Sequence, residues 1–419
     1  MSELLRLAAA SLWNRRFTVL LTVLTVAVSV MLFLGVERLR QDARESFLRT
    51  VAGTDLIVGA RSHPVQLLLY SVFRLGDATN NLSWTSYEDI AGQPGVAWTV
   101  PIALGDSHRG YRVVGTTPGY FEHVKYAGER GIEFAQGRPF VELFDAVLGA
   151  EVARRLGYRL GEQIVLAHGT ATVNPQQHDD RPFTVVGVLA PTGTPIDQGV
   201  YVSLQAIEAI HLNWRAGTRI GRAPDPSQLD PERLRPRSIT AFYLGLSDRM
   251  AVFALQRHIN EYRAEPLTAV LPGVALQQLW RLLGTAERAL QVTAACVVLA
   301  GLLGLLTVLL ATLSERRREM AILRSVGAGP RHVLALLLLE ALLLASAGAL
   351  LGLLLLQALV FALAPWLQAQ YGIAVAPGWP SAAEWKLLGI VIGAAGVVGL
   401  LPALMAYRRS VADGMSIRT

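Results

Sequence analysis

Residues Phe17 to Val36 read FTVLLTVLTVAVSVMLFLGV, a run without a single charged side chain. An α-helix rises about 1.5 Å per residue, so about 20 residues cross the roughly 30 Å hydrocarbon core of a bilayer. Apolar residues occupy every face of this run, whereas a helix on the surface of a soluble domain has a polar face. The sequence therefore predicts a transmembrane helix at 17–36.

A cleaved secretory signal is the alternative for this run, because Arg6, Arg15 and Arg16 precede it. The run is longer than the usual apolar region of a signal, however. Glu37 and Arg38 also follow where a cleavage site requires small residues. We therefore favour a helix that stays in the mature protein.

Three further apolar runs are long enough to cross a membrane. They lie at 289–313, at 333–363, where only Glu340 and Gln357 interrupt the run, and at 387–406. The composition agrees, because only 17% of the 419 residues are charged and the mean hydropathy is +0.38, whereas a soluble domain has about 25% charged residues. We predict a membrane protein with four transmembrane helices.

The short segments that flank the four runs differ in positive charge. Arginines gather in the N-terminal segment 1–16, the loop 314–332 and the tail 407–419, whereas Lys386 is the only cation of the loop 364–386. Cytoplasmic flanks of membrane helices are enriched in Arg and Lys. We therefore expect the first three segments in the cytoplasm, and 37–288 and 364–386 on the opposite side.

The segment 37–288 is large enough to form a domain of its own. It contains 26 acidic and 26 basic residues, and this neutrality excludes a nucleic-acid-binding domain, which needs a clustered basic surface. Short β-branched or aliphatic runs alternate in it with helical patterns, which predicts an α+β domain of two lobes. We expect strands at 55–59, 111–115, 146–149, 163–166, 183–189 and 239–246. We expect helices at 83–91, 151–156, 203–211 and 247–262, a long loop at 213–237, and N-caps at Ser203 and Ser247.

Both ends of this domain have apolar residues at helical spacing next to a membrane run. The segments 37–51 and 274–288 are therefore predicted to form a helical stalk that transmits movement between membrane and domain. Two ordinary helices that pack on the domain are the alternative.

No motif of catalytic chemistry occurs in the sequence, and we expect no catalytic residue. A P-loop needs Gly-Lys-Ser/Thr, and neither Lys125 nor Lys386 lies in such a frame. The eight histidines show no HxxxH spacing. His178 beside Asp179 and Asp180 is the one candidate for metal binding, but the pattern favours a solvated loop, so no metal site is predicted.

Five residues within the membrane runs attract attention. Glu340 is the one carboxylate inside a run, and an ionisable group there indicates either a function or a pair with an arginine of the cytoplasmic loop. Gly348 and Gly352, like Gly389 and Gly393, have the GxxxG spacing that allows close packing of helices.

The cytoplasmic loop reads SERRREMAILRSVG from Ser314 to Gly327. Its acidic residues come early, Arg324 comes late, and a small apolar patch lies between them, as in a short amphipathic helix. Such a helix either lies among lipid headgroups or enters a groove on a partner.

This loop resembles the signature E-R-x-x-E-x-A-I-L-R-x-x-G-A, which follows the second membrane helix in ABC-transporter permeases of the FtsX/MacB type, including LolC and LolE. The matching residues are Glu315, Arg316, Glu319, Ala321, Ile322, Leu323, Arg324, Gly327 and Ala328. Glu340 with the glycines after it, and Pro402 with Ala403 and Ala406, also match family patterns, although Val411 stands where the family has proline. The runs at 147–157, 160–162 and 183–188 resemble the MacB-like periplasmic core.

The resemblance implies a permease subunit of a mechanotransmitting ABC transporter in the bacterial inner membrane, with both termini cytoplasmic. It would work with a second copy or a paralogue and with a dimer of a separate cytoplasmic ABC ATPase, which would bind ATP and Mg²⁺. A coupling helix would dock on that ATPase through Glu315, Arg316, Glu319, Ile322, Leu323, Arg324 and Gly327. Glu340, Gly348, Gly352, Gly389, Gly393 and Pro402 would serve helix packing.

The resemblance further implies movement of the periplasmic domain for export or for handling of lipoproteins or lipids. A periplasmic adaptor or lipoprotein is a further candidate partner. Two other functions remain open at this stage. One is an FtsX-like regulator of periplasmic cell-wall hydrolases, and the other is a membrane-anchored periplasmic sensor or metal-binding protein.

Overall fold

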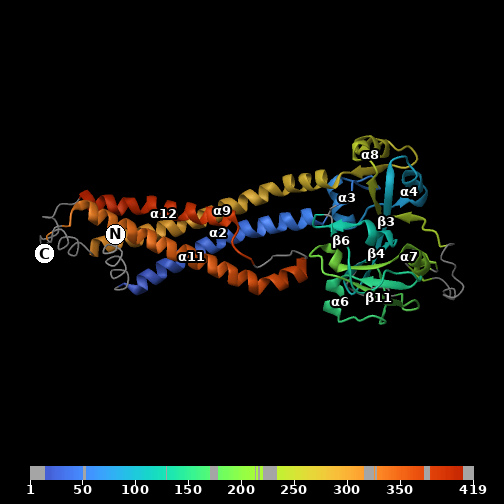
Figure 1. Ribbon diagram of the computed structural model, residues 1–419, viewed down its shortest axis with the longest axis horizontal. Helices are drawn as coiled ribbons and strands as arrows, with labels where there is room; N and C mark the ends of the chain where they lie inside the picture. Colours follow the sequence, from blue (N-terminus) through green and yellow to red (C-terminus); the bar gives the residue numbers. More distant parts are fainter. Residues whose placement is uncertain are drawn as a thin grey trace. The chain divides into compact units, whose positions relative to one another are not determined.

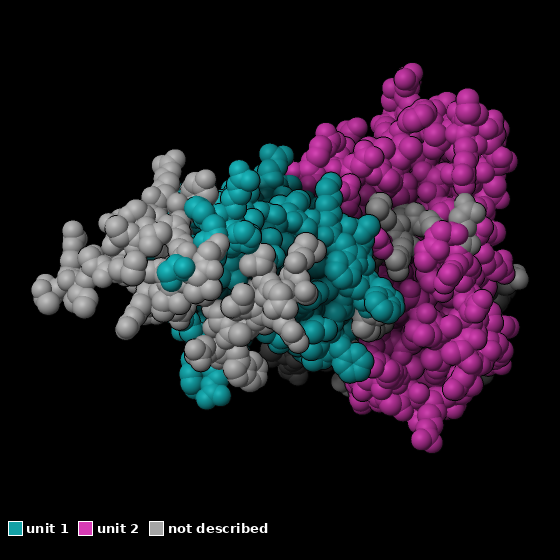
Figure 2. Space-filling view, turned by 60° about the vertical axis from the view of Figure 1, so that its left-hand side comes forward, with its two compact units in different colours: residues 1–42, 284–366, 375–419 teal, residues 43–283, 367–374 magenta. Residues whose placement is uncertain are grey.

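Four long helices are the most extended elements of the computed structural model (Figure 1): α2 (Arg16–Arg49), α9 (Pro272–Glu315), α11 (Pro330–Tyr371) and α12 (Ala382–Arg408). The structure describes residues 15–50, 53–128, 130–169, 178–212, 214–215, 218–219, 234–315, 325, 328–371 and 378–408. The chain divides into unit 1 (residues 1–42, 284–366 and 375–419) and unit 2 (43–283 and 367–374), which Figure 2 distinguishes by colour.

Each long helix contains a stretch that is long and apolar enough to cross a membrane. These stretches are Arg16–Asp42, Pro272–Ala311, Pro330–Ala364 and Ala382–Met405. Many of their large apolar side chains are exposed, among them Leu32, Leu299, Leu354 and Leu401, as expected of a helix that faces lipid. The predicted fold class, four membrane helices with a large mixed domain between the first two, is confirmed.

Unit 2 is built on an 11-stranded sheet. Nine strands form it in the order β17 (Leu267–Val270), β1 (Leu56–Ala60), β16 (Ala241–Leu246), β3 (Val96–His108), β4 (Tyr111–Thr116), β12 (Gly199–Ser203), β8 (Asp145–Leu148), β11 (Phe183–Leu189) and β7 (Phe134–Gly137). Two more lie off this path: β10 (Ala167–His168) pairs with β3, and β9 (Gln163–Ile164) pairs with β11. Most pairs are antiparallel, but β12 runs parallel to β4, and β11 runs parallel to β8.

The strand β3 joins the two halves of this sheet. Its residues from Val96 to Ile102 pair with β16, and those from Ala103 to His108 pair with β4. The sequence predicts no strand here, because Pro101 and Gly105 are unusual inside a central strand. Gly105 lies at a register shift between Leu104 and Ser107, so this part of the strand is a β-bulge, which glycine favours.

Short helices cover both halves of the sheet (Figure 1): α3 (Pro64–Ser71), α4 (Trp84–Ala91), α5 (Gly119–His123), α6 (Ala150–Leu156), α7 (Leu204–His211) and α8 (Val252–Asn260). The remaining elements are the two-residue strands β2 (Leu82–Ser83), β5 (Lys125–Tyr126), β6 (Arg130–Gly131), β13 (Trp214–Arg215), β14 (Thr218–Arg219) and β15 (Ser238–Ile239), and the 3₁₀ turns η1 (Pro195–Gln198) and η4 (Arg249–Ala251). Most of the predicted loop at 213–237 lies outside the described residues.

The half of the sheet around β1 is buried on both faces. Successive residues of β1 belong to different cores: Ile57 packs with Tyr243 and with Leu276 of α9, whereas Val58 packs with Phe242 and the residues of α4 and α8. Side chains alternate between the faces of a strand, so this one strand contributes to both cores. Full burial of one such side chain stabilises the fold by about 1.5–3 kcal/mol.

The structure shows the N-termini of the two helices for which the sequence predicts a capping serine. Ser203 caps α7 as predicted, since its Oγ accepts a hydrogen bond from the backbone N–H of Ala206 at 3.0 Å. The prediction of a cap at Ser247 is wrong. Its hydroxyl donates to the carbonyl of Gly95 instead, while Asp248 caps the turn η4, and α8 begins only at Val252.

Candidate functional site

The predicted coupling loop lies almost entirely outside the described residues. Glu315 is the last residue of α9, Ser325 is helical, and α11 begins at Pro330. The candidate docking residues Arg316, Glu319, Ile322, Leu323, Arg324 and Gly327 lie outside the described residues. Their role in binding an ATPase stays a prediction.

Glu340 lies in α11 and is only 4% exposed. It is ten residues from the start of that helix, about 15 Å along its axis at about 1.5 Å per residue. A carboxylate is rarely buried inside a membrane helix without a structural or functional reason. Of the loop arginines proposed as its partners, Arg331 is an exposed residue in the first turn of α11. The others, Arg316, Arg317, Arg318 and Arg324, lie outside the described residues.

The two GxxxG pairs have different surroundings in unit 1. A Cβ added at Gly348 would lie 2.7 Å from Cβ of Val26, and one at Gly352 would lie 2.5 Å from the carbonyl oxygen of Ala27. The backbones of α11 and α2 can therefore approach closely only because these residues have no side chain. Nothing lies within 4 Å of a Cβ built at Gly389 or Gly393, so these two glycines contact no neighbouring helix in the described part of the chain.

The C-terminal helix α12 has a defined beginning and a proline near its end. Ser381 and Glu384 form a capping box: the N–H of Glu384 donates to Oγ of Ser381 at 3.2 Å, and the N–H of Ser381 donates to Oε2 of Glu384 at 2.6 Å. The sequence pattern of serine and glutamate before an apolar run is typical of this motif, but the sequence analysis missed it. Pro402 lies inside the helix, which continues to Arg408.

An ion pair joins α2 and α12 in unit 1. Nη1 of Arg38 lies 3.5 Å from Oε1 of Glu384, and both side chains are at least nine-tenths buried. A buried pair of this kind is costly to break, because the remaining charge would lose its partner. Three exposed tryptophans lie where α11 ends and α12 begins: Trp366 is near the end of α11, Trp379 precedes α12, and Trp385 is in the first turn of α12. Tryptophans are enriched at membrane–water interfaces.

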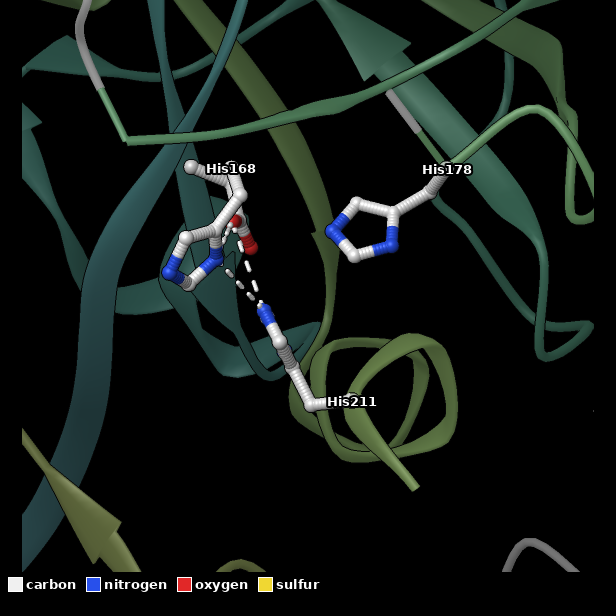
Figure 3. A group of neighbouring side chains, drawn as sticks. His168, His178 and His211 are labelled. Atoms are coloured by element: carbon white, nitrogen blue, oxygen red, sulfur yellow. Dashed lines mark hydrogen bonds and ion pairs between the residues drawn. The ribbon is translucent and has the colours of Figure 1, made fainter. Parts of the chain in front are cut away.

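Four side chains with metal-ligating atoms converge in unit 2: Asp106, His168, His178 and His211. Figure 3 shows the three imidazole rings pointing toward one another. Nδ1 of His168 lies 3.1 Å from Nε2 of His211, and Oδ1 of Asp106 lies 3.4 Å and 3.5 Å from these two nitrogens. One ligand atom from each of the four residues can be chosen so that all lie within 4.8 Å of one another.

Different elements place these four side chains. Asp106 lies in the bulge of β3, and His168 of β10 is its direct antiparallel neighbour, so the two side chains share one face of the sheet. His211 is the last residue of α7. The N–H of His178 donates to the carbonyl of Leu166 at 2.8 Å, which holds His178 beside the chain segment that leads to β10.

Burial and mutual contacts shift the pKa values of this cluster. Burial is the largest influence on the Asp106 carboxyl and alone would raise its pKa, but the hydrogen bonds of His168 and His211 outweigh burial and bring the pKa to about 2. Burial lowers the pKa of His178 to about 4. Burial also acts to lower the pKa of His211, yet its hydrogen bond to Asp106 outweighs this and raises the pKa. At neutral pH, Asp106 is ionised and His178 is a neutral imidazole.

The interpretation of His178 as part of a solvated loop is wrong, because its side chain is 0% exposed. Sequence reasoning missed the cluster since its members are 62, 10 and 33 residues apart in the chain, with none of the short spacings of known metal motifs. The pairing of His168 with Asp106 across the sheet, the end of α7 at His211 and the backbone contact of His178 with Leu166 bring these residues together. No local sequence pattern predicts these contacts.

Two family models match the chain, one over each half. A model described as the MacB-like periplasmic core domain matches residues 19–258, and one described as the FtsX-like permease C-terminal matches residues 292–412. The chain belongs to the FtsX/MacB family of ABC-transporter permeases. Asp106, His168, His178 and His211, which we call the His-rich cluster, therefore all lie within its MacB-like periplasmic domain.

Two solved structures are similar to this FtsX/MacB permease. The periplasmic region of MacB from Actinobacillus actinomycetemcomitans is 12% identical, with 55% of this chain and 94% of that chain covered and a TM-score of 0.34. The extracellular domain of the noncanonic ABC-type transporter YknZ from Gram-positive bacteria is 12% identical, with 52% and 99% covered and a TM-score of 0.31. No curated protein sequence matches the chain.

Family membership settles the broad class of the protein. It is a permease component of an ABC transporter, with transmembrane helices and a periplasmic domain, and this component is not itself catalytic. The prediction of an ABC permease of the FtsX/MacB type is thereby confirmed.

Proposed function

We propose that this permease transmits mechanical work from a separate cytoplasmic ATPase to its periplasmic domain. The observation that carries the proposal is the continuity of two helices across the boundary of the units. The helix α2 extends from residue 16 in unit 1 to residue 49 in unit 2, and α9 extends from residue 272 in unit 2 to residue 315 in unit 1, each without a break. Because a continuous helix is stiff, a displacement at one end moves the other.

The outer end of α9 is anchored in the periplasmic domain. Ala275, Leu276 and Leu279 of α9 belong to the same core as Ile57 of β1 and Tyr243 of β16. The helix has 44 residues, about 66 Å at about 1.5 Å per residue, so it is long enough to cross a bilayer and still reach beyond it. A pull on α9 from the cytoplasmic side would therefore act directly on the sheet.

The source of energy must be another chain. The sequence has no Gly-Lys-Ser/Thr phosphate-binding motif, so ATP and Mg²⁺ would be bound by a partner ATPase. We infer that this partner docks on the loop 314–332, through the apolar residues Ile322 and Leu323 with Glu315, Arg316, Glu319, Arg324 and Gly327 around them. The permease itself would then be a dimer, formed by two copies or by a copy and a paralogue.

The proposed coupling to a cytoplasmic ATPase also implies an orientation of the four helices in the membrane. Arginines flank the ends of the helices at 1–16, 314–332 and 407–419, which supports cytoplasmic termini in the inner membrane. The exposed tryptophans near the end of α11 and the start of α12 support a membrane–water interface at the opposite side. The periplasmic domain would use the transmitted movement for export or for handling of lipoproteins or lipids, with an adaptor or lipoprotein as a candidate partner.

Docking is tested by Leu323→Asp in the full chain, co-expressed with a candidate ABC ATPase that co-purifies with the wild type. A carboxylate in the apolar patch would have to be desolvated on docking, so we expect the ATPase to be lost from the purified complex and its permease-stimulated activity to fall at least tenfold. Leu75→Asp makes the same chemical change at an exposed residue of the periplasmic domain and should leave both unchanged. Retention of the ATPase and its activity by Leu323→Asp would contradict the proposed docking surface.

A further inference from the structure

We propose that Asp106, His168, His178 and His211 bind one divalent transition-metal ion, and that Zn²⁺ is the ion their donor atoms fit best. The site would lie within the periplasmic domain, where β3, β10, the segment before β11 and the end of α7 meet. This inference does not depend on the proposed coupling to an ATPase.

The distances among three donor atoms match a tetrahedral metal site. Zn²⁺ is bound by imidazole nitrogen and carboxylate oxygen at about 2.0–2.2 Å, and tetrahedral geometry at that radius places the ligand atoms about 3.3–3.6 Å apart. The atoms Nδ1 of His168, Nε2 of His211 and Oδ1 of Asp106 lie 3.1, 3.4 and 3.5 Å apart. They therefore already form one triangular face of a coordination tetrahedron.

His178 can supply the fourth ligand. The largest separation among the four candidate atoms is no more than 4.8 Å, about 1.5 Å beyond a tetrahedral edge. On metal binding, a change in the His178 side-chain torsions would close this difference. The ring is held close to the other three side chains by its backbone hydrogen bond to Leu166.

A second layer of contacts orients the histidine at the end of α7. Nδ1 of His211 lies 2.8 Å from the carbonyl oxygen of Ile207. A carbonyl only accepts hydrogen bonds, so Nδ1 carries a proton. In the metal-free protein Nε2 donates toward the ionised Asp106, and binding of a metal ion would release that proton and direct the Nε2 lone pair at the ion. Donation of the far ring N–H to a backbone carbonyl is the usual support of a metal-ligating histidine.

Hydrogen bonds connect the backbone segments that carry the four candidate ligands. The buried Arg181, three residues after His178, donates from Nη1 to the carbonyl oxygen of Ala209, in the last turn of the helix that ends at His211. The bulge in β3 turns Asp106 toward its neighbour His168. Such preorganisation lowers the entropy that metal binding costs.

The site also has an entry path. The side chains of His168 and His211 are 45% and 27% exposed, whereas Asp106 is 2% exposed and His178 is fully buried. An ion from solvent would therefore first meet the two partly exposed histidines and would then also bind the two buried side chains. An accessible route is one condition of a working metal site.

The donor set selects a class of ion. Three imidazoles and one carboxylate suit Zn²⁺ and its neighbours in the first transition series. Ca²⁺ and Mg²⁺ require oxygen ligands, and Cu⁺ prefers thiolate or thioether sulfur, which none of the four residues provides. The near-tetrahedral spacing favours Zn²⁺ within this class.

The test uses the full-length protein in detergent, purified through a tag without histidines and stripped with a chelator. After incubation with Zn²⁺ and removal of free ions, elemental analysis should find one Zn²⁺ per chain. His168→Ala and His211→Ala, both at partly exposed positions, should each weaken Zn²⁺ binding at least tenfold. His258→Ala removes an exposed histidine outside the cluster and should leave the stoichiometry at one.

A second readout does not depend on any variant. Co²⁺ bound in place of Zn²⁺ to four nitrogen and oxygen ligands should give the intense visible absorption of a four-coordinate site, and Zn²⁺ should displace it. Metal binding should also raise the Tm by roughly 5–10 °C at a hundredfold excess over Kd. Less than half an ion per chain in the wild type, or binding unchanged in both cluster variants, would overturn the proposal, as would a six-coordinate Co²⁺ spectrum.

Discussion

Ser203 and Ser247 occupy similar positions in the sequence, each at the start of a helical pattern that follows a β-branched run. Only Ser203 caps a helix, because its Oγ reaches the N–H of Ala206, whereas the hydroxyl of Ser247 bonds to Gly95. An adjacent aspartate, Asp248, takes the capping role. At the scale of single residues, two neighbouring residues with equal capping propensity make the exact boundary hard to predict.

The difference between the two serines gives a prediction about stability. Ser203→Ala should destabilise the periplasmic domain by about 1 kcal/mol, because it removes the acceptor of a helix N-terminal N–H. This corresponds to a fall in Tm of about 2–4 °C for a domain of this size. Ser247→Ala, which removes only a hydrogen bond at the surface, should change the Tm by about 1 °C or less.

Thermal unfolding of the full-length variants, followed by circular dichroism in detergent, compares the two substitutions under equal conditions. Equal changes in Tm for the two substitutions would contradict a stabilising role of the Ser203 cap.

The His-rich cluster marks the limit of prediction at the residue scale. From the sequence, His178 is expected in a solvated loop, because its neighbours Asp179 and Asp180 are polar. Its ring packs against the rings of His168 and His211, which are distant in the chain, and Asp106 joins them through the register of β3 and β10. The pairing of strands that lie far apart in the chain leaves no local pattern in a single sequence.

At the scale of elements, the apolar helices were the most predictable. Twenty or more apolar residues in a row have few structural alternatives to a membrane helix, and all four were expected. The short strands at 183–189 and 239–246 also agree with β11 and the region of β15 and β16. The central strand β3 was missed, because Pro101 and Gly105 argue against a strand, and the bulge that accommodates Gly105 forms only in the folded sheet.

The packing of α11 on α2 gives a prediction about one glycine pair. Gly352→Ala should lower the stability of the full-length protein in detergent by about 1–3 kcal/mol, because the new methyl group would collide with the carbonyl of Ala27. Gly389→Ala is the matched control: nothing lies within 4 Å of its added Cβ, and both substitutions gain similarly in helix propensity.

The two glycine variants are compared by unfolding with a denaturing detergent. We expect a clear fall in the midpoint for Gly352→Ala and an unchanged or slightly higher midpoint for Gly389→Ala. If Gly352→Ala is as stable as the control, close packing of α11 and α2 at this glycine is excluded.

At the scale of the whole molecule, the sequence established the family, the number of membrane helices and the position of the large domain between the first two. These features follow from apolar length and from motifs that are local in the chain. The physical link between the membrane and the periplasmic domain depends on the extent of α2 and α9, which continue past the boundary of the units without a break. The sequence predicts a stalk at 37–51 and 274–288, with two ordinary helices that pack on the domain as the alternative.

Transmission of movement through α9 is tested most directly by hydrogen exchange of the permease in complex with its ATPase. ATP is added together with vanadate, and amide exchange is followed over residues 272–283, where α9 joins the core of the periplasmic domain. We predict that nucleotide changes the exchange of this segment at least twofold in the wild type and not in Leu323→Asp. An active, intact complex in which nucleotide leaves the exchange of the periplasmic domain unchanged would contradict the proposed transmission.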